Sequence, residues 1–288
     1  MSTGGYTVVG SNSFRHRLFQ LYLPLVFFAV FLLFPFAWML IVSLKPANDL
    51  LDTSINPFLL YGVTLDHYRF LFEETDFLRW TLNTFVVTVG ATILSLVCSI
   101  LIGYALGRLR FRGGNTMGVA IFLAYLIPPT LLFIPLAQVI TRFNMYGEYW
   151  ALIFTYPTFL IPFAGWLLMG YFRTIPIELE QAAMVDGATR LRAMWTIILP
   201  LALPGVLSAG IFCFTLGWNE FLYALVFMST GSMKTVPVGV VSDLIRADVV
   251  FYGSLMAAGI LGSVPVAIAY SFFVDHYISG LTAGATKG

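Results

Sequence analysis

Between two long apolar segments the chain reads ELEQAAMVDGA at residues 178–188. This stretch predicts a short helix over residues 178–185, because Glu178 and Glu180 lie near its start, where the helix dipole favours anions. Gly187 then supplies the permissive backbone that a sharp change of direction requires. A polar helix and a turn between two apolar segments predict an elbow that docks on another protein.

A second amphipathic helix is expected after this turn. Its apolar residues recur at helical spacing: Leu191, Met194, Trp195 and Ile198. Pro200 and Pro204 mark the place where this helix turns into the next apolar segment, because proline interrupts regular helical hydrogen bonding. The elbow is therefore expected to end where a membrane span begins.

The composition of the chain indicates its broad class. Hydrophobic residues make up 59% of the 288 residues, charged residues make up 10%, and the mean hydropathy is +0.88. A soluble domain has about a quarter of its residues charged. The formal net charge of +1 gives no indication of a nucleic acid partner. The chain is expected to be a polytopic membrane protein in contact with lipid.

Six windows lack charged residues over a length that can cross a bilayer, which takes about 20 apolar residues. They are Leu18–Leu44, Trp80–Gly107, Gly113–Thr141, Tyr149–Phe172, Ala193–Asn219 and Val249–Val274. The first window is too long for the apolar region of a signal peptide, and no small-residue cleavage site follows it. The sequence therefore predicts an all-α protein with six transmembrane helices, of which the first is retained.

Lys and Arg residues near the span ends predict the orientation, because cytoplasmic loops carry an excess of them. One side collects Arg15, Arg17, Arg108, Arg110, Arg112, Arg173, Arg190, Arg192 and Lys287. The cations of the other side are diluted by acids: Lys45, Arg69, Arg79, Arg142, Lys234 and Arg246. Both termini and the elbow are therefore expected in the cytoplasm.

Prolines interrupt two neighbouring windows. The third window contains Pro128, Pro129 and Pro135, and the fourth contains Pro157 and Pro162. Backbone groups that proline frees inside a membrane must find partners in protein or water. Two interpretations stay open: these helices line a path or bend during a cycle, or the kinks only shape the bundle.

An acid follows the fifth window. If that span starts near Leu201, Glu220 lies roughly 28 Å along it, close to the outer surface. Trp218 and Tyr223 fit an aromatic belt at that depth. Asn219 and Glu220 are therefore predicted to lie either at the interface or in an outward-facing gate.

Small residues inside the windows are interpreted as packing positions. Gly103 and Gly107 have the spacing that permits close contact between membrane helices. Cys98 and Cys213 both fall inside apolar windows, where a small packing residue is the expected role.

Catalytic and metal-binding patterns are nearly absent from the sequence. The chain has no phosphate-binding loop of the form G-x-x-x-x-G-K-[ST], and no His, Cys and Asp cluster has metal-ligand spacing. We expect neither an enzyme nor a bound cofactor or metal. A stand-alone secondary transporter is the competing class, against which stand the elbow and the lack of an evident internal repeat.

The run from Gln181 to Ala188, followed by Leu199-Pro200 and Pro204, resembles the EAA signature of ABC importer permeases. The Trp218–Phe221 segment and the ending from Gly280 are similar to the maltose-transporter-type branch, which serves carbohydrates. The resemblance covers essentially the whole chain. One departure is Gln181, where the signature usually has Glu, so docking is expected to rest on shape and on Asp186.

This resemblance implies a permease subunit of a binding-protein-dependent importer, in a bacterial cytoplasmic (inner) membrane. The implied solute is a sugar, with glycerol phosphate or a polyamine as the alternative. The implied partners are a second homologous permease, two ATPase subunits that bind ATP and Mg, and an extracytoplasmic solute-binding protein. The implied organisation is a cytoplasmic tail (1–17), a first span (18–44), an extracytoplasmic segment (45–79), a MetI-like permease core (80–275) formed by spans two to six with a coupling loop (173–200), and a cytoplasmic tail (276–288).

The resemblance also implies three sets of contact residues. The coupling loop would contact the ATPase with Glu180, Gln181, Ala182, Ala183, Met184, Asp186, Gly187 and Ala188. The tail would contact the ATPase with Gly280, Leu281, Thr282, Gly284 and Lys287. The outer loop would reach the binding protein through Lys234, Asp243 and Arg246. Asp186 is expected to cap the second helix of the elbow.

Overall fold

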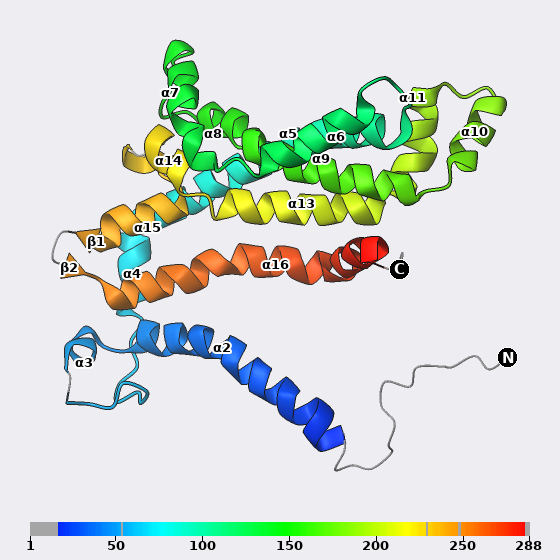
Figure 1. Ribbon diagram of the computed structural model, residues 1–288. Coiled ribbons are helices and arrows are strands. Elements are labelled where there is room, and N and C mark those ends of the chain that lie inside the picture. The colour runs from blue at the N-terminus through cyan, green and yellow to red at the C-terminus, as the bar shows by residue number, and fades with distance from the viewer. Residues whose placement is uncertain (1–16, 53, 229, 247–248, 286–288) are drawn as a thin grey trace. The chain divides into compact units, whose positions relative to one another are not determined.

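The structure is a computed structural model that describes residues 17–285 except 53, 229 and 247–248 (Figure 1). It is built almost entirely of helices and divides into two units. Unit 1 comprises Met1–Glu73 and Phe251–Ile260, and unit 2 comprises Glu74–Val250 and Leu261–Gly288.

The first apolar window belongs to unit 1. A π-helical turn, η1 (Leu18–Tyr22), continues into α2 (Leu23–Leu44), so the predicted first span is one helix of the predicted length. Two short helices follow, α3 (Ala47–Leu51) and α4 (Asp66–Glu73). The imidazole of His67 on α4 packs against Gly253, near the start of α16 (Tyr252–Ala285), so closely that a side chain at position 253 would require the ring to move.

Unit 2 contains the remaining elements. They are α5 (Phe77–Arg108), α6 (Gly114–Tyr125), η2 (Pro129–Leu131), α7 (Phe133–Arg142), α8 (Tyr149–Thr155), α9 (Pro157–Thr174), α10 (Ile177–Val185), α11 (Arg190–Ala193), η3 (Met194–Ile198), α12 (Leu199–Leu201), α13 (Leu203–Trp218), α14 (Leu222–Phe227), η4 (Gly231–Met233), α15 (Val236–Leu244), β1 (Ile245–Arg246), β2 (Val249–Val250) and the later part of α16. The two short strands pair antiparallel, with Ile245 opposite Val250.

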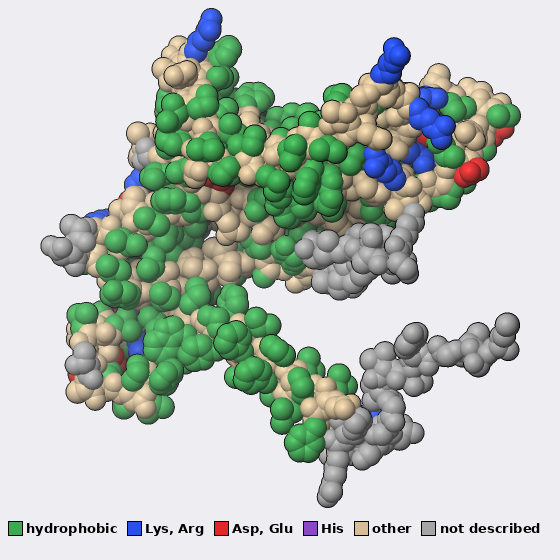
Figure 2. Space-filling view, in the orientation of Figure 1, with side chains coloured by type: hydrophobic (Ala, Val, Ile, Leu, Met, Phe, Trp, Pro, Cys, Tyr) green, Lys and Arg blue, Asp and Glu red, His purple; other side chains and the backbone are tan. Residues whose placement is uncertain are grey.

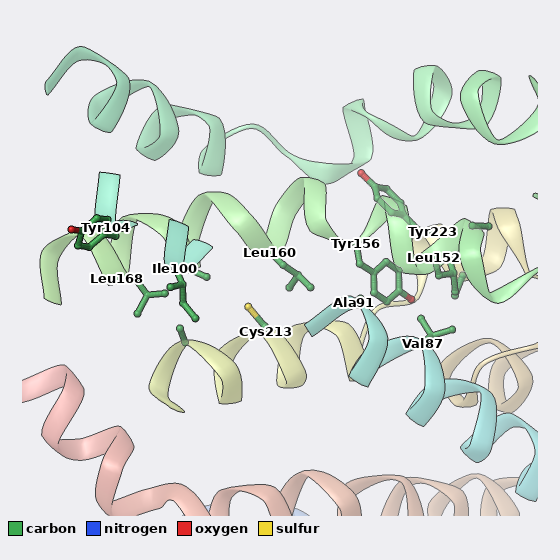
Figure 3. Packing of buried hydrophobic residues seen from close by; sticks show 14 of the residues in the cluster. Val87, Ala91, Ile100, Tyr104, Leu152, Tyr156, Leu160, Leu168, Cys213 and Tyr223 are labelled. Carbon is green, nitrogen blue, oxygen red and sulfur yellow. The ribbon is translucent and has the colours of Figure 1, made fainter. Parts of the chain in front are cut away.

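The core of unit 2 forms where α5 packs along α9 and α13. Cys213 of α13 and Leu160 of α9 are fully buried and point into the space between these helices (Figure 3). A Cβ atom at Gly103 would lie 2.9 Å from the Cβ atom of Leu168, and one at Gly107 would lie 3.0 Å from the Met169 carbonyl oxygen. The two glycines therefore serve the close helix contact that their spacing predicts.

Among the residues that the structure describes, four helices are long and apolar enough to cross a membrane: Leu18–Leu44, Phe77–Arg108, Tyr149–Thr174 and Tyr252–Phe272. A fifth span results if Arg190–Leu201 and Leu203–Trp218, which meet at 77°, are counted together. The predicted third span is not one helix, because it is divided into α6 and α7 around Pro128 and Pro129. Adjacent prolines remove two consecutive N–H donors, which a continuous helix cannot tolerate.

Replacing Gly103 by valine should destabilise the protein by about 1–3 kcal/mol, because the added carbons must displace the backbone of α9. Gly170 is the matched control, since a Cβ atom there meets nothing within 4 Å. Unfolding of both purified variants in detergent measures the difference. Equal stability of Gly103→Val and Gly170→Val would contradict this packing.

Candidate functional site

The elbow has the predicted order of helix, turn and helix. It projects at one end of unit 2, where α10 and α11 lie beyond the end of α9 (Figure 1). Gly187 has a φ of +89°, which makes it the turn residue. Its N–H donates to Met184 O at 3.1 Å, and Ala188 N–H donates to Ala183 O at 3.0 Å. These two bonds satisfy the last carbonyls of α10 in the way that a glycine after a helix end commonly allows.

The second helix of the elbow is capped by Thr189. Its hydroxyl accepts from the N–H of Arg192 at 3.3 Å, and Thr189 directly precedes the first helical residue, Arg190. The expectation that Asp186 caps this helix is therefore wrong. Asp186 lies at the carboxyl end of α10, too early in the chain to reach the free N–H groups of α11.

A buried arginine joins the elbow to the membrane helices. Arg108 is the last residue of α5, and its side chain is 4% exposed. Its guanidinium donates to Ile175 O at 2.5 Å, to Pro176 O at 3.2 Å and to Phe172 O at 3.4 Å. It also donates from Nε to Glu180 Oε2 at 3.2 Å. One side chain thus holds the end of α9 and the start of α10 to α5.

Glu180 is the acid that receives this arginine. Its carboxylate is 5% exposed, and Tyr104 donates its hydroxyl to Oε1 at 2.7 Å. Arg190 of α11 lies 3.9 Å from Oε1. Tyr104 and Arg108 are one helical turn apart on α5, so both reach the same carboxylate. The attraction to the guanidinium and the hydrogen bond from the tyrosine hydroxyl offset the free energy that the carboxylate loses when it is removed from water.

The two faces of α10 account for Gln181, which stands where the EAA signature usually has Glu. Glu180 and Ala183 are buried against the rest of unit 2, whereas Gln181 and Ala182 are exposed. Val185 is 87% exposed. Since successive residues turn by 100° around a helix, the neighbouring positions 180 and 181 cannot both face inward. The internal ion pair belongs to Glu180, and Gln181 lies on the open face.

Sequence reasoning missed Tyr104 and Arg108 as parts of this site. The Arg108–Arg112 turn served only as a marker of orientation, although the spacing of Tyr104 and Arg108 placed two donors on one helix face. No pattern in the sequence reveals that these donors meet residue 180, because the contact joins segments 72 residues apart.

A polar cavity of about 780 Å³ adjoins the elbow. It lies between the α5–α6 turn and the junction of α9 with α10, and its lining includes Arg108, Arg110, Arg173 and Glu178. Lys and Arg side chains gather at this end of unit 2 (Figure 2). The elbow therefore has an exposed face on α10, and the cavity beside it is lined by arginine side chains.

The predicted gate residues close a break between two helices. Asn219 donates its amide to Thr215 O at 2.8 Å, at the carboxyl end of α13. The carboxylate of Glu220 accepts from the N–H groups of Tyr223 at 2.8 Å and Ala224 at 3.1 Å, in the first turn of α14. Both side chains thus act as helix caps. Whether they also form a gate stays a prediction.

The three predicted outer-loop residues lie together. Lys234 Nζ is 2.7 Å from Asp243 Oδ1, and Arg246 Nε donates to Asp243 O at 2.9 Å. Asn83 of α5 donates to the Lys234 carbonyl at 2.8 Å, so this loop is attached to the helix core. The contact with a binding protein stays a prediction.

The predicted tail is helical as far as Ala285, because α16 continues through it. Gly280, Leu281, Thr282 and Gly284 belong to this helix, and Lys287 lies outside the described residues. Within the described part of the chain, no group of three or more His, Cys, Asp or Glu residues is placed to hold a metal ion.

The family described as "Binding-protein-dependent transport system inner membrane component" matches residues 99–282. Among similar proteins, the inner membrane ABC transporter permease YcjP of Escherichia coli is 38% identical over 270 residues, with 93% of this chain and 95% of YcjP covered. The sulfoquinovosyl glycerol permease SmoH of Agrobacterium fabrum is 36% identical, with 89% of each chain covered. The trehalose/maltose permease MalG of Thermococcus litoralis is 33% identical, with 91% and 94% covered.

One solved structure has a similar fold over nearly the whole chain. It is a bacterial ABC transporter that imports the acidic polysaccharide alginate, with a TM-score of 0.76, 19% sequence identity and coverage of 93% of this chain and 99% of that chain. At 19% sequence identity, this similarity shows a shared fold.

Replacing Arg108 by methionine should lower the free energy of unfolding by about 3–5 kcal/mol, because Glu180 then stays buried without its cation. The double variant Arg108→Met, Glu180→Gln should be less damaged than the sum of the single changes, with a coupling of about 0.5–3 kcal/mol. Denaturant unfolding of the full chain in detergent measures both. Gln181→Ala is the control on the open face; if Arg108→Met is no less stable than this control, the ion pair contributes nothing.

Proposed function

The chain belongs to the family of binding-protein-dependent transport system inner membrane components, and from this premise we propose that it is a permease subunit of an ABC importer for a sugar or sugar-like solute. The names of similar proteins support the solute class, because they include permeases for trehalose/maltose and sulfoquinovosyl glycerol. The single observation that carries the coupling role is the attachment of the elbow to α5 and α9 through Arg108.

We propose six spans, with both termini and the elbow in the cytoplasm of a bacterial inner membrane. The divided segment from α6 to α7 would form the third span, and the bent pair ending in α13 would form the fifth. Arginines at the elbow end support this orientation: Arg108, Arg110, Arg112, Arg173, Arg190 and Arg192. The same orientation would place the pair of Lys234 and Asp243 outside, where a binding protein would deliver its solute.

The proposed partners are a second permease, two ATPase subunits that bind ATP and Mg, and an extracytoplasmic binding protein. A transporter of similar fold has been solved with an alginate pentasaccharide-bound periplasmic protein, which supports a partner of that type. The open face of α10 would dock on the ATPase, with Gln181, Ala182 and Asp186 exposed for this contact. The tail, including Gly280 and Thr282, is proposed as a second ATPase contact.

The coupling step follows from the way the elbow is attached. ATP-driven closure of the ATPase pair would move α10, and the Glu180–Arg108 ion pair would pass this motion to the ends of α5 and α9. The spans would then change between inward-open and outward-open arrangements, a two-state equilibrium that ATP and the loaded binding protein shift. Hydrolysis itself takes place in the partner subunit.

The test of this function is reconstitution of the co-purified complex in lipid vesicles. ATPase activity should rise with a sugar-loaded binding protein, and the same sugar should accumulate inside. A panel of sugars, glycerol phosphate and a polyamine identifies the solute class. Uptake of the last two compounds alone would overturn the sugar assignment.

Ala182→Trp should abolish uptake and remove the ATPase from the purified complex, because a bulky ring on the exposed face of α10 blocks close approach. The free energy of unfolding should change by less than about 0.5 kcal/mol, the range for exposed surface substitutions. Ala182→Ser is the control that keeps the side chain small. Normal uptake by Ala182→Trp would exclude this face as the docking surface.

A further inference from the structure

The division between α6 and α7 leaves a backbone carbonyl without its helical donors. In a continuous helix, Tyr125 O would accept from the N–H of residue 128 or 129, and both of these residues are proline. The carbonyl of Ala124 takes the N–H of Ile127 instead, at 3.2 Å. The break therefore presents a hydrogen-bond acceptor that α6 itself cannot satisfy.

In the proposed arrangement of six spans, this break lies at membrane depth. The twelve residues of α6 extend about 18 Å, well inside a hydrocarbon core of about 30 Å. Every residue from Phe122 to Leu131 is exposed in the chain. Irregular backbone at this depth cannot face lipid and must face protein or a water-filled cavity. The segment therefore belongs on the inside of the assembled transporter.

The position of the break is fixed by a second helix. Tyr223 of α14 is fully buried, and its hydroxyl donates to Pro129 O at 2.9 Å. The backbone N–H of Tyr223 is in turn held by Glu220. The break is thus a built feature, attached to the capped junction of α13 and α14.

Four aromatic residues adjoin the break, and we name them the aromatic platform: Phe122, Tyr125, Phe163 and Trp166. The rings of Tyr125 and Phe163 lie 5.2 Å apart, as do those of Phe122 and Trp166. Phe163 also stacks on Phe212 of α13, with ring centroids 3.7 Å apart, which ties the platform to α13. Phe122, Tyr125 and Trp166 remain 37%, 38% and 40% exposed.

An aromatic surface beside a carbonyl that lacks its helical donors matches the chemistry of a sugar. A pyranose ring has an apolar face of C–H groups, which packs on an aromatic ring, and a rim of hydroxyls, which donate to carbonyl oxygens. Ligand sites commonly combine apolar walls with a few polar groups in this way. A lipid chain would use the rings but would offer no donor to Tyr125 O.

We propose that the aromatic platform and the Tyr125 carbonyl form a contact site for a sugar ring on the translocation path. This inference rests on the proposed function and adds its substrate contacts. The sugar passes over the platform with its C–H face on the rings while its hydroxyls bond to the break. The proline pair keeps the carbonyl open, and Tyr223 keeps the break in place.

The test compares Trp166→Leu and Tyr125→Leu in the reconstituted complex. Both changes retain apolar bulk and remove the aromatic face, so uptake of sugar should fall by roughly tenfold, as expected when a central aromatic contact is lost. Trp166→Phe should restore most of the uptake. ATPase stimulation by the loaded binding protein should persist in all variants, because neither docking surface is altered.

Trp150→Leu is the matched control. Trp150 on α8 is 57% exposed, stacks with Phe154 at 5.5 Å and lines an apolar cavity along α5 to which no platform residue contributes, so its replacement should leave uptake unchanged. Normal uptake by Trp166→Leu and Tyr125→Leu would overturn the contact site while leaving the proposed function intact. Loss of the second permease from the purified variants would also overturn it, since the platform would then be a subunit contact. Failure of the unaltered complex to import any sugar would instead overturn the proposed function.

Discussion

The ion pair between Arg108 and Glu180 is the constraint on which the elbow depends. A short helix such as α10, with nine residues, is marginal by itself in water. It is held by a carboxylate that is 5% exposed, where a guanidinium and a tyrosine hydroxyl replace water. The same guanidinium binds one carbonyl of α9, Phe172 O, and two in the link to α10, Ile175 O and Pro176 O, so it ties the elbow to the ends of α5 and α9.

Two further places in unit 2 have the same arrangement: a helix is interrupted, and nearby side chains bind backbone groups at the break. Asn219 and Glu220 cap the two helix ends at the α13–α14 break. Tyr223 binds the carbonyl of Pro129 at the α6–α7 break. Breaks of this kind are tolerated in a membrane only inside protein or beside water. The α6–α7 break is also the place beside which the proposed sugar contacts lie.

Much of this fold could be predicted from the sequence, because charge-free windows and glycine or proline positions report local physics. The bounds of the first span and the turn at Gly187 are such cases. The partner of Glu180 could not be predicted, since Arg108 meets it only through tertiary packing. The cap by Thr189 was missed because Asp186 has the more favoured side chain, although Thr189 has the right position. The division of the third span depended on how Pro128 and Pro129 are accommodated, which neighbouring helices decide.

We propose that α10 and the end of α5 move as one body when the ATPase closes. The direct measurement is the distance between spin labels at two exposed positions outside the docking residues, Leu179 on α10 and Phe111, in the complete complex with and without trapped ATP. This distance should stay constant in active complexes, whereas the distance from Leu179 to Val241 on α15 should change. A change of several ångströms between Leu179 and Phe111 would contradict the proposal.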